Sequence, residues 1–272
     1  MTSKIQNAIL RKPAIAGFLL ILLFFSKSMF AQTGWYFTSS VQLSGGKYVF
    51  DSYNRVYSVY SGMRYQGENF GITASIPLVT SNNKNGSQSS GMMVTSGTNN
   101  VSGTGISQNG INFGLGDLYG YFDYKIISDF ENELDVYVNA QIKIPTAAAQ
   151  MNIGTGKYDF GGSVSLRKSF DSFIGVVDLG YLNIGDPDGV TYKDPFTYGI
   201  GIGKFFNTGE YSLLLYYTGY TKIVDAYDSP QQLSLGVNYR TSETIILSVI
   251  GSAGKGNFAP DFTLSSGIRI NL

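Results

Sequence analysis

The protein has 272 residues, with 19 basic and 19 acidic side chains, 34 glycines, 20 tyrosines and 18 phenylalanines. It contains neither cysteine nor histidine, which excludes disulfide bonds, thiolate metal sites and a Ser-His-Asp triad. Charged residues make up 14% of the chain, against roughly 25% in ordinary soluble domains. The composition therefore favours many short strands that face something other than water.

The first 31 residues have the layout of a secretory signal peptide. Lys4, Arg11 and Lys12 precede an apolar run over residues 14–25, and a short polar stretch ends at Ala31, after which we predict cleavage. The apolar run is shorter than the ~20 residues that a helix needs to span a bilayer, which disfavours the alternative of an uncleaved membrane anchor.

The mature chain, residues 32–272, is expected to be acidic. Loss of residues 1–31 removes four basic residues and no acidic one, which leaves 15 basic and 19 acidic side chains and a formal charge of −4. A nucleic-acid-binding protein needs a basic surface to neutralise phosphates, so we expect no nucleic acid as a partner.

Hydrophobicity alternates with a period of two along the mature chain, and no helical period is sustained. In residues 134–144, Leu, Val, Ala and Ile alternate with Asp, Tyr, Asn, Gln and Lys. Most segments of this kind hold about ten residues, the length of a tilted strand that crosses a membrane. We predict twelve strands, at residues 35–43, 56–65, 69–79, 117–127, 134–144, 158–168, 173–182, 196–206, 210–220, 231–240, 244–252 and 262–272.

The connections between these segments alternate between long and short. The longest covers residues 80–116 and is rich in Ser, Gly, Asn and Thr. Outer-membrane barrels have long extracellular loops and short periplasmic turns, whereas a soluble sandwich has no reason to sort its connections in this way. Hydrocarbon offers no partner to unpaired backbone groups, so the sheet must close on itself. The predicted fold class is all-β: a single antiparallel transmembrane β-barrel of about 12 strands, one domain over residues 32–272, with residues 80–116 as a long extracellular loop.

The two faces of the predicted sheet differ in charge. On the apolar face the charged residues are Lys168 and Lys204, each close to a short turn, where a lysine side chain can reach the membrane interface. Outward aromatic residues gather towards strand ends, as expected for two interfacial girdles. They are Trp35, Phe37, Tyr57, Tyr65, Phe70, Tyr158, Phe173, Tyr181, Phe196, Tyr211, Tyr239 and Phe262.

The opposite face carries the candidate site residues, which we expect to face the lumen of the barrel. They comprise tyrosines and an equal mixture of acids and bases, and Asp117 and Tyr216 share their register. The candidates are Tyr60, Arg64, Tyr119, Tyr121, Asp123, Lys125, Asp135, Tyr137, Lys143, Asp159, Arg167, Asp178, Arg240, Asp261 and Arg269.

Two interpretations of these residues stay open. Mixed charges on neighbouring strands form a ladder that fills and stiffens the interior, which we favour over acid–base chemistry by paired carboxylates. Equal numbers of acids and bases argue against a strongly charge-selective filter, because such a filter uses a ring of one sign. The tyrosines either contact an apolar or sugar-like solute or fill a lumen of intermediate width.

Two motifs that suggest ligand sites are better explained as turns. The Gly-x-Gly pairs at residues 114–116 and 154–156 precede strands, whereas a phosphate loop needs a following helix. Residues 185–194 offer three carboxylates but lack the spacing of an EF-hand. We therefore predict no metal site and no cofactor.

Several stretches resemble an outer-membrane protein family of the meta-pathway of phenol degradation (MetA-pathway), a set of transporter-like barrels from Gram-negative bacteria. The resemblance covers residues 110–272, although Ala147 stands where the family pattern has glycine and the chain ends in Leu272 rather than phenylalanine. It implies passage of small aromatic or hydrophobic compounds. The matching residues are Gly114-Leu115-Gly116-Asp117-Leu118, Lys143-Ile144-Pro145-Thr146, Gly154-Thr155-Gly156-Lys157-Tyr158-Asp159, and Gly180-Tyr181 with Asn183 and Gly185.

We predict an outer-membrane channel for passive passage of a small, weakly polar or aromatic solute. The alternative is a non-conducting structural or surface-interaction barrel that acts through its extracellular loops. A membrane-embedded hydrolase needs a positioned base, and the chain has no histidine, so we predict that it is not an enzyme. The expected partners are outer-membrane lipid, a small hydrophobic or aromatic solute, and barrel-assembly machinery that engages the C-terminal strand.

Overall fold

The computed structural model describes residues 33–48, 53–81, 86–89, 92–95, 112–147, 156–186 and 192–272. The predicted signal peptide and most of the predicted loop 80–116 lie outside these residues. Within them, no helix is both long and apolar enough to cross a membrane.

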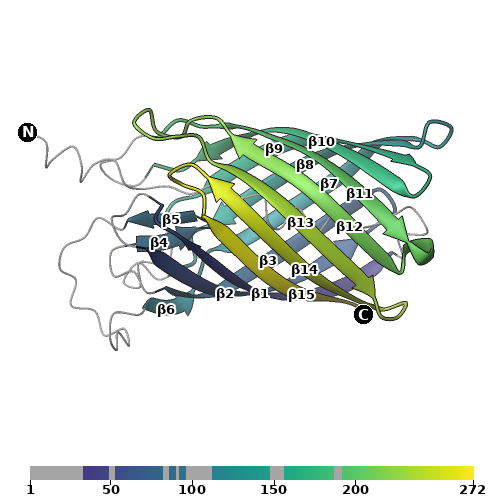
Figure 1. Cartoon of the computed structure of the whole chain (residues 1–272), viewed down its shortest axis with the longest axis horizontal. Helices are drawn as coiled ribbons and strands as arrows, with labels where there is room; N and C mark the ends of the chain where they lie inside the picture. Colours follow the sequence, from purple (N-terminus) through teal and green to yellow (C-terminus); the bar gives the residue numbers. More distant parts are fainter. Residues whose placement is uncertain are drawn as a thin grey trace, which may run out of the picture.

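The strands close into one antiparallel β-barrel with twelve strand positions (Figure 1), which confirms the predicted fold class. β15 pairs with β1, and β2 pairs with both β1 and β3, so the ring has no open edge. The barrel strands are β1 (Gly34–Gly46), β2 (Asn54–Gln66), β3 (Phe70–Ser81), β6 (Asn112–Leu115), β7 (Leu118–Asp129), β8 (Leu134–Ile144), β9 (Asp159–Phe170), β10 (Phe173–Ile184), β11 (Phe196–Phe206), β12 (Tyr211–Tyr220), β13 (Gln231–Arg240), β14 (Ile245–Lys255) and β15 (Phe262–Asn271).

β6 and β7 share one strand position, because both pair with β3. The ladder breaks between them at Gly116 and Asp117, opposite Pro77 of β3. Proline has no N–H to donate, and its carbonyl accepts the N–H of Gly116 at 2.8 Å. Two further short strands, β4 (Gly86–Ser89) and β5 (Met92–Thr95), pair with each other. Three short strands thus lie within residues 80–116, for which one long loop was predicted.

The two ends of the barrel differ in the length of their connections. At the short-turn end, connections of two to four residues follow β2, β7, β9, β11 and β13, and one of them contains the 3₁₀ helix η2 (Asn207–Gly209). At the long-loop end, connections of six residues or more follow β1, β3, β8, β10, β12 and β14. Figure 1 shows β4, β5 and β6 at the long-loop end and the C-terminus at the short-turn end.

The outer face of the barrel is apolar and carries aromatic residues near both ends. Val41, Leu179 and Ile200 are each more than half exposed, as expected for side chains that contact lipid. At the short-turn end, the rings of Tyr211 and Tyr239 stack with their centroids 4.8 Å apart. Other close ring pairs are Trp35–Tyr65 and Phe170–Phe173 at the same end, and Tyr158–Phe160 and Tyr181–Phe196 at the long-loop end. These pairs form two belts of the kind that marks membrane interfaces.

Candidate functional site in the barrel lumen

The lumen has two walls of different chemistry, formed by the inward-facing residues of each strand. The polar wall, on β1–β3 and β7–β9, carries most of the buried polar and charged side chains. The apolar wall lies on β10–β12 and β14.

The two walls face each other across the barrel. In the ring of twelve strand positions, β1, β2 and β3 lie opposite β10, β11 and β12. The apolar wall consists of Ile174, Val176, Leu182, Ile184, Phe205, Leu214, Tyr216, Tyr220 and Ile250.

Arg64 of β2 forms a two-point ion pair with Asp123 of β7 across the intervening strand β3. Its Nη1 lies 2.8 Å from Oδ1 and its Nη2 lies 3.0 Å from Oδ2. Nη1 also donates to the hydroxyl of Thr73 at 3.2 Å. The guanidinium lies over Gly71, where a Cβ atom would be only 2.0 Å from Nη2. Paired contacts of this geometry are the strongest ion pairs available to arginine, so they fix Arg64 against the wall.

Lys143 of β8 lies between two carboxylates in the most deeply buried charged group. Its Nζ is 2.7 Å from Oδ2 of Asp159 and 3.9 Å from Oδ2 of Asp117, and none of the three side chains is more than 1% exposed. Oδ1 of Asp117 accepts the N–H of Ala147, and Oδ1 of Asp159 accepts the N–H of Gly185. The group therefore ties the connections that follow β8 and β10 to the long-loop end of the barrel wall.

Tyr137 of β8 is a lumen-facing ring with two cations against it. The guanidinium carbon of Arg167 lies 4.1 Å from the ring centroid, and Nζ of Lys125 lies 5.8 Å from it. Lys125 also forms an ion pair with Asp135 at 3.6 Å, and both of those side chains are about one-fifth exposed. The arrangement is a cross-strand network of mixed charges around an aromatic ring.

Asp178 of β10 faces the lumen. Among the described residues, it is the one inward-facing carboxylate on the strands that form the apolar wall. Its Oδ2 accepts the Tyr216 hydroxyl at 2.7 Å, and its Oδ1 accepts the Ser165 hydroxyl. Tyr216 lies over Gly199 and Gly201 of β11, where a Cβ atom would come within 2.0 Å of its hydroxyl oxygen and 2.6 Å of its ring, respectively. The glycines thus make room for the tyrosine that holds Asp178.

The remaining sequence-predicted residues divide into buried tyrosines and residues at the barrel ends. Tyr60, Tyr119 and Tyr121 are each at most 7% exposed, and Tyr119 packs against Tyr121. Arg240 is the last residue of β13 and is exposed, and Asp261 precedes β15 and is also exposed. Both residues keep the inward register of their strands, so they lie at the rims of the lumen, outside its buried part.

The apolar wall was not predicted from the sequence. On β10, Ile174, Val176 and Leu182 are inward-facing and at most 6% exposed, whereas Val177 and Leu179 point outward. Both faces of this strand are apolar, so the alternation that marks the other strands is weak here. A membrane strand that is apolar on both faces is the signal that would have revealed the wall.

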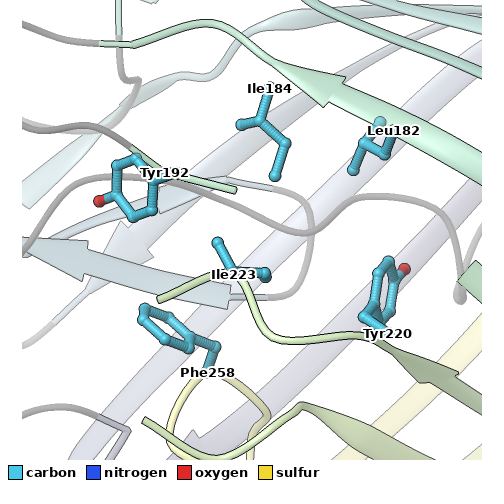
Figure 2. Close-up of a cluster of buried hydrophobic side chains, with 6 residues drawn as sticks. All are labelled: Leu182, Ile184, Tyr192, Tyr220, Ile223 and Phe258. Carbon is cyan, nitrogen blue, oxygen red and sulfur yellow. The ribbon is translucent and has the colours of Figure 1, made fainter. Parts of the chain in front are cut away.

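The apolar wall continues into a mouth cluster at the long-loop end (Figure 2). Leu182, Ile184 and Tyr220 come from the wall, and Tyr192, Ile223 and Phe258 come from the connections after β10, β12 and β14. Ile223 lies near the centre of the group in Figure 2, and it and Phe258 are each 1% exposed. These three connections therefore fold back over the apolar wall.

A second group at the same end lies on the polar-wall side. Tyr48, in the connection after β1, packs with Val56 and Val79, and Ala147 lies against them. Burial raises the pKa of the Tyr48 hydroxyl above its ordinary value, so this phenol stays neutral.

A cavity of 40 Å³ lies at the polar wall, enough for roughly three water molecules. Its lining combines polar residues such as Asp123, Asn139 and Ser163 with the rings of Phe122 and Tyr181. Asn139 donates to the hydroxyls of Ser163 and Ser165 at 3.0 and 2.8 Å, so this part of the wall is a continuous set of hydrogen-bonding groups.

The described residues contain no group of three or more carboxylate, histidine or cysteine side chains that could hold a metal ion. The carboxylate-bearing segment 185–194 is described only in part, since residues 187–191 lie outside the described residues. In the part that is described, Asp194 accepts from the Ile184 N–H and Asp186 from the Tyr192 N–H, which are contacts typical of a turn.

Comparison with known proteins places the fold among outer-membrane β-barrels. No family model and no curated protein matches the chain. The crystal structure of the COG4313 outer membrane channel from Pseudomonas putida F1 is similar over 91% of this chain and 99% of that chain, with a TM-score of 0.64 and 11% identity. The KdgM porin in complex with disordered oligogalacturonate is similar over 86% of this chain and 99% of that one, with a TM-score of 0.51 and 7% identity. At these identities the likeness establishes the fold, which is that of outer-membrane β-barrels, and the narrower phenol-degradation family stays a prediction.

Proposed function

We propose that the protein is an outer-membrane channel for passive passage of a small, weakly polar or aromatic solute. The observation that carries this proposal is the two-walled lumen, in which an apolar wall faces a wall of polar and charged groups. A solute that is partly apolar and partly polar gains contacts with both walls, whereas a fully hydrated solute gains contacts with one. The likeness to a channel and a porin supports the proposal at the level of the fold.

The same proposal includes the location and the assembly partners. A cleaved signal peptide over residues 1–31 would direct the chain through the inner membrane, and the barrel-assembly machinery would engage β15, the C-terminal strand. Membership of the phenol-degradation family belongs to this proposal as well, supported by the sequence motifs at residues 114–118, 143–146, 154–159 and 180–185.

Electrical recording from planar lipid bilayers tests the proposal. The refolded protein, shown to be closed by heat-modifiable gel mobility, is expected to give discrete conductance steps in KCl. Catechol is expected to interrupt the current, because its ring can contact the apolar wall, whereas glycerol at the same concentration is expected to leave it unchanged. A folded barrel that conducts no ions, or one on which the two solutes act alike, contradicts the proposal.

The second candidate is a non-conducting barrel that acts through its extracellular connections. The mouth cluster favours it, because three connections fold over the lumen and bury Tyr192, Ile223 and Phe258. This candidate predicts no conductance from the folded protein, so the same recordings decide between the two.

We also propose that the protein has no enzymatic activity. The chain lacks histidine and cysteine. The inward carboxylates of Asp117, Asp123, Asp135 and Asp159 are held in ion pairs with Lys or Arg, which leaves them poorly suited to act as a general base.

A further inference from the structure

The lumen-facing charges are separated along the barrel axis, although acids and bases are equal in total. The half near the short-turn end has more bases than acids, whereas the half near the long-loop end has more acids than bases. Asp178 lies near the middle of its strand. The bases near the short-turn end are Arg64, Lys125, Arg167, Arg240 and Arg269, with the acids Asp123 and Asp135; near the long-loop end lie Lys143, Asp117, Asp159 and Asp261.

Two of the bases near the short-turn end, Arg240 and Arg269, form what we call the basic pair. Arg240 of β13 and Arg269 of β15 are each paired with Ile246 of β14, the strand that lies between them. Their Cα atoms are therefore about 10 Å apart. Among the described residues, no carboxylate forms an ion pair with either of them. Arg64, by contrast, is held by Asp123.

The basic pair is accessible from the lumen. Arg240 is exposed and Arg269 is partly exposed. The guanidinium carbon of Arg269 lies 5.6 Å from the ring centroid of Tyr36, a cation–π contact that does not neutralise its charge. Arg64 and Arg269 lie on the two strands that flank β1, opposite Tyr36 and Thr38, so the three cations lie in the same region of the lumen.

Acidic residues also lie at the short-turn end, but mainly on the turns. A charge on a turn acts through water and is screened over about 10 Å at 0.1 M salt, whereas charges along a lumen with low-dielectric walls act on a solute at close range. Asp129 is engaged by its own turn, since it accepts the N–H groups of Glu131 and Asn132. The acidic residues of this rim are Glu68, Asp129, Glu131, Glu133, Asp171, Glu210 and Glu243.

The basic pair adjoins the apolar wall. Ile250 of that wall faces the lumen on β14, four residues from Ile246, which is a distance of about 13 Å along the strand. The long side chains of Arg240 and Arg269 shorten the gap between the cations and the apolar surface. Ile250 is 3% exposed and packs against its neighbours in the wall. A small solute whose charged group lies near the basic pair would therefore place its apolar body at this wall by displacing some of those contacts.

We propose that the solute of this channel is a small amphipathic anion, with an apolar aromatic or aliphatic body and one anionic group such as a carboxylate. The apolar wall receives the body, and Arg240 and Arg269 attract the anionic group. This inference rests on the proposed channel function and names the class of its solute.

Ion selectivity in planar bilayers tests the attraction for anions. The reversal potential in a tenfold KCl gradient is expected to give a chloride-to-potassium permeability ratio above one that falls as salt concentration rises. The double variant Arg240→Gln with Arg269→Gln is expected to lower that ratio by on the order of fivefold. Its matched control, Lys168→Gln with Lys204→Gln, removes two positive charges from the outer face of the same end and is expected to leave the ratio unchanged.

Two permanently charged sulfonates test the apolar body, because neither crosses lipid unaided. Benzenesulfonate is expected to be more permeant than methanesulfonate despite its larger size. Ile250→Thr is expected to abolish this preference, and hydroxyls are tolerated on that face because Ser248 and Ser252 lie beside it. Val249→Thr makes a similar change on the outer face and serves as the control.

The outcomes separate this inference from the channel function. A conducting protein with a chloride-to-potassium permeability ratio of one or below contradicts the proposal that the solute is an anion, and so does a ratio that the Arg240 and Arg269 substitutions leave unchanged. Neither result contradicts the channel function. Anion selectivity without a preference for benzenesulfonate over methanesulfonate contradicts the proposal that the solute has an apolar body. A heat-modifiable barrel without conductance overturns the channel and the inference together.

Discussion

Individual buried charges in this barrel act as structural fasteners. The lumen-facing ion pairs join residues of different strands, and the best-buried of them also hold backbone N–H groups of the connections. The cost of breaking each pair depends on its burial. Water screens the charges of an exposed pair and can solvate either partner alone, whereas a buried charge that loses its partner has no other group to neutralise it.

Replacement of Lys143 by methionine is expected to destabilise the folded barrel by about 3–5 kcal/mol, because it leaves Asp117 and Asp159 buried without a counter-charge. Lys125→Met, which breaks a pair that is about one-fifth exposed, is expected to cost less than about 1 kcal/mol. Urea unfolding in lipid vesicles, followed by the fluorescence of the single tryptophan, Trp35, measures both. Equal losses in the two variants would show that burial does not decide the cost.

Gly71→Ala is expected to destabilise the protein by about 1–3 kcal/mol, because the new methyl group would displace Arg64 from Asp123. Gly251→Ala is the control, since no atom lies within 4 Å of a Cβ at that position. The same unfolding measurement applies, and the prediction fails if the two alanine variants are equally stable.

At the scale of the element, the strands were predictable because each shows a period of two between recognisable turns. The predicted strands at residues 134–144, 196–206 and 231–240 coincide with β8, β11 and β13, and the others differ from the observed bounds by a few residues at their ends. Two features escaped this method. β6 has only four residues and is separated from β7 by the break opposite Pro77. The register of β10 was predicted through Asp178, but the strand is apolar on both faces, so its inward apolar residues did not stand out as a wall.

The short turn after β11 stores backbone strain. Thr208 has φ 54° and ψ 28°, a left-handed conformation that is unfavourable for a β-branched residue. Thr208→Gly is therefore expected to stabilise the barrel by up to about 1 kcal/mol, after allowance for the greater freedom of glycine in the unfolded chain. Thr241→Gly provides a comparison at another short turn, where the backbone is not left-handed, and is expected to be neutral or destabilising. A loss of stability on Thr208→Gly would rule out strain at this turn.

At the scale of the whole molecule, the mouth cluster couples the connections to the lumen. Phe258→Ala removes a ring that is 1% exposed and packs edge-on against Tyr227 at 5.4 Å, so it is expected to loosen the connections after β10, β12 and β14. The variant is expected to conduct more than the parent protein while it keeps its heat-modifiable mobility, because the barrel wall itself is unchanged. Phe130→Ala, at an exposed position in a short turn, is the control. Identical conductance in the parent and in Phe258→Ala would show that the cluster does not restrict the lumen.

Alternation and the lengths of the connections determined the fold class, the number of strands and the outward position of the apolar residues, because these depend on local period and on the need to pair every backbone group in lipid. Tertiary structure decided which charges meet and where they lie along the axis. Arg64 and Asp123 are 59 residues apart and lie on strands that do not pair with each other, so no local pattern links them. The opposition of the apolar and polar walls likewise arises only when the ring closes, since closure places β10–β12 across the lumen from β1–β3.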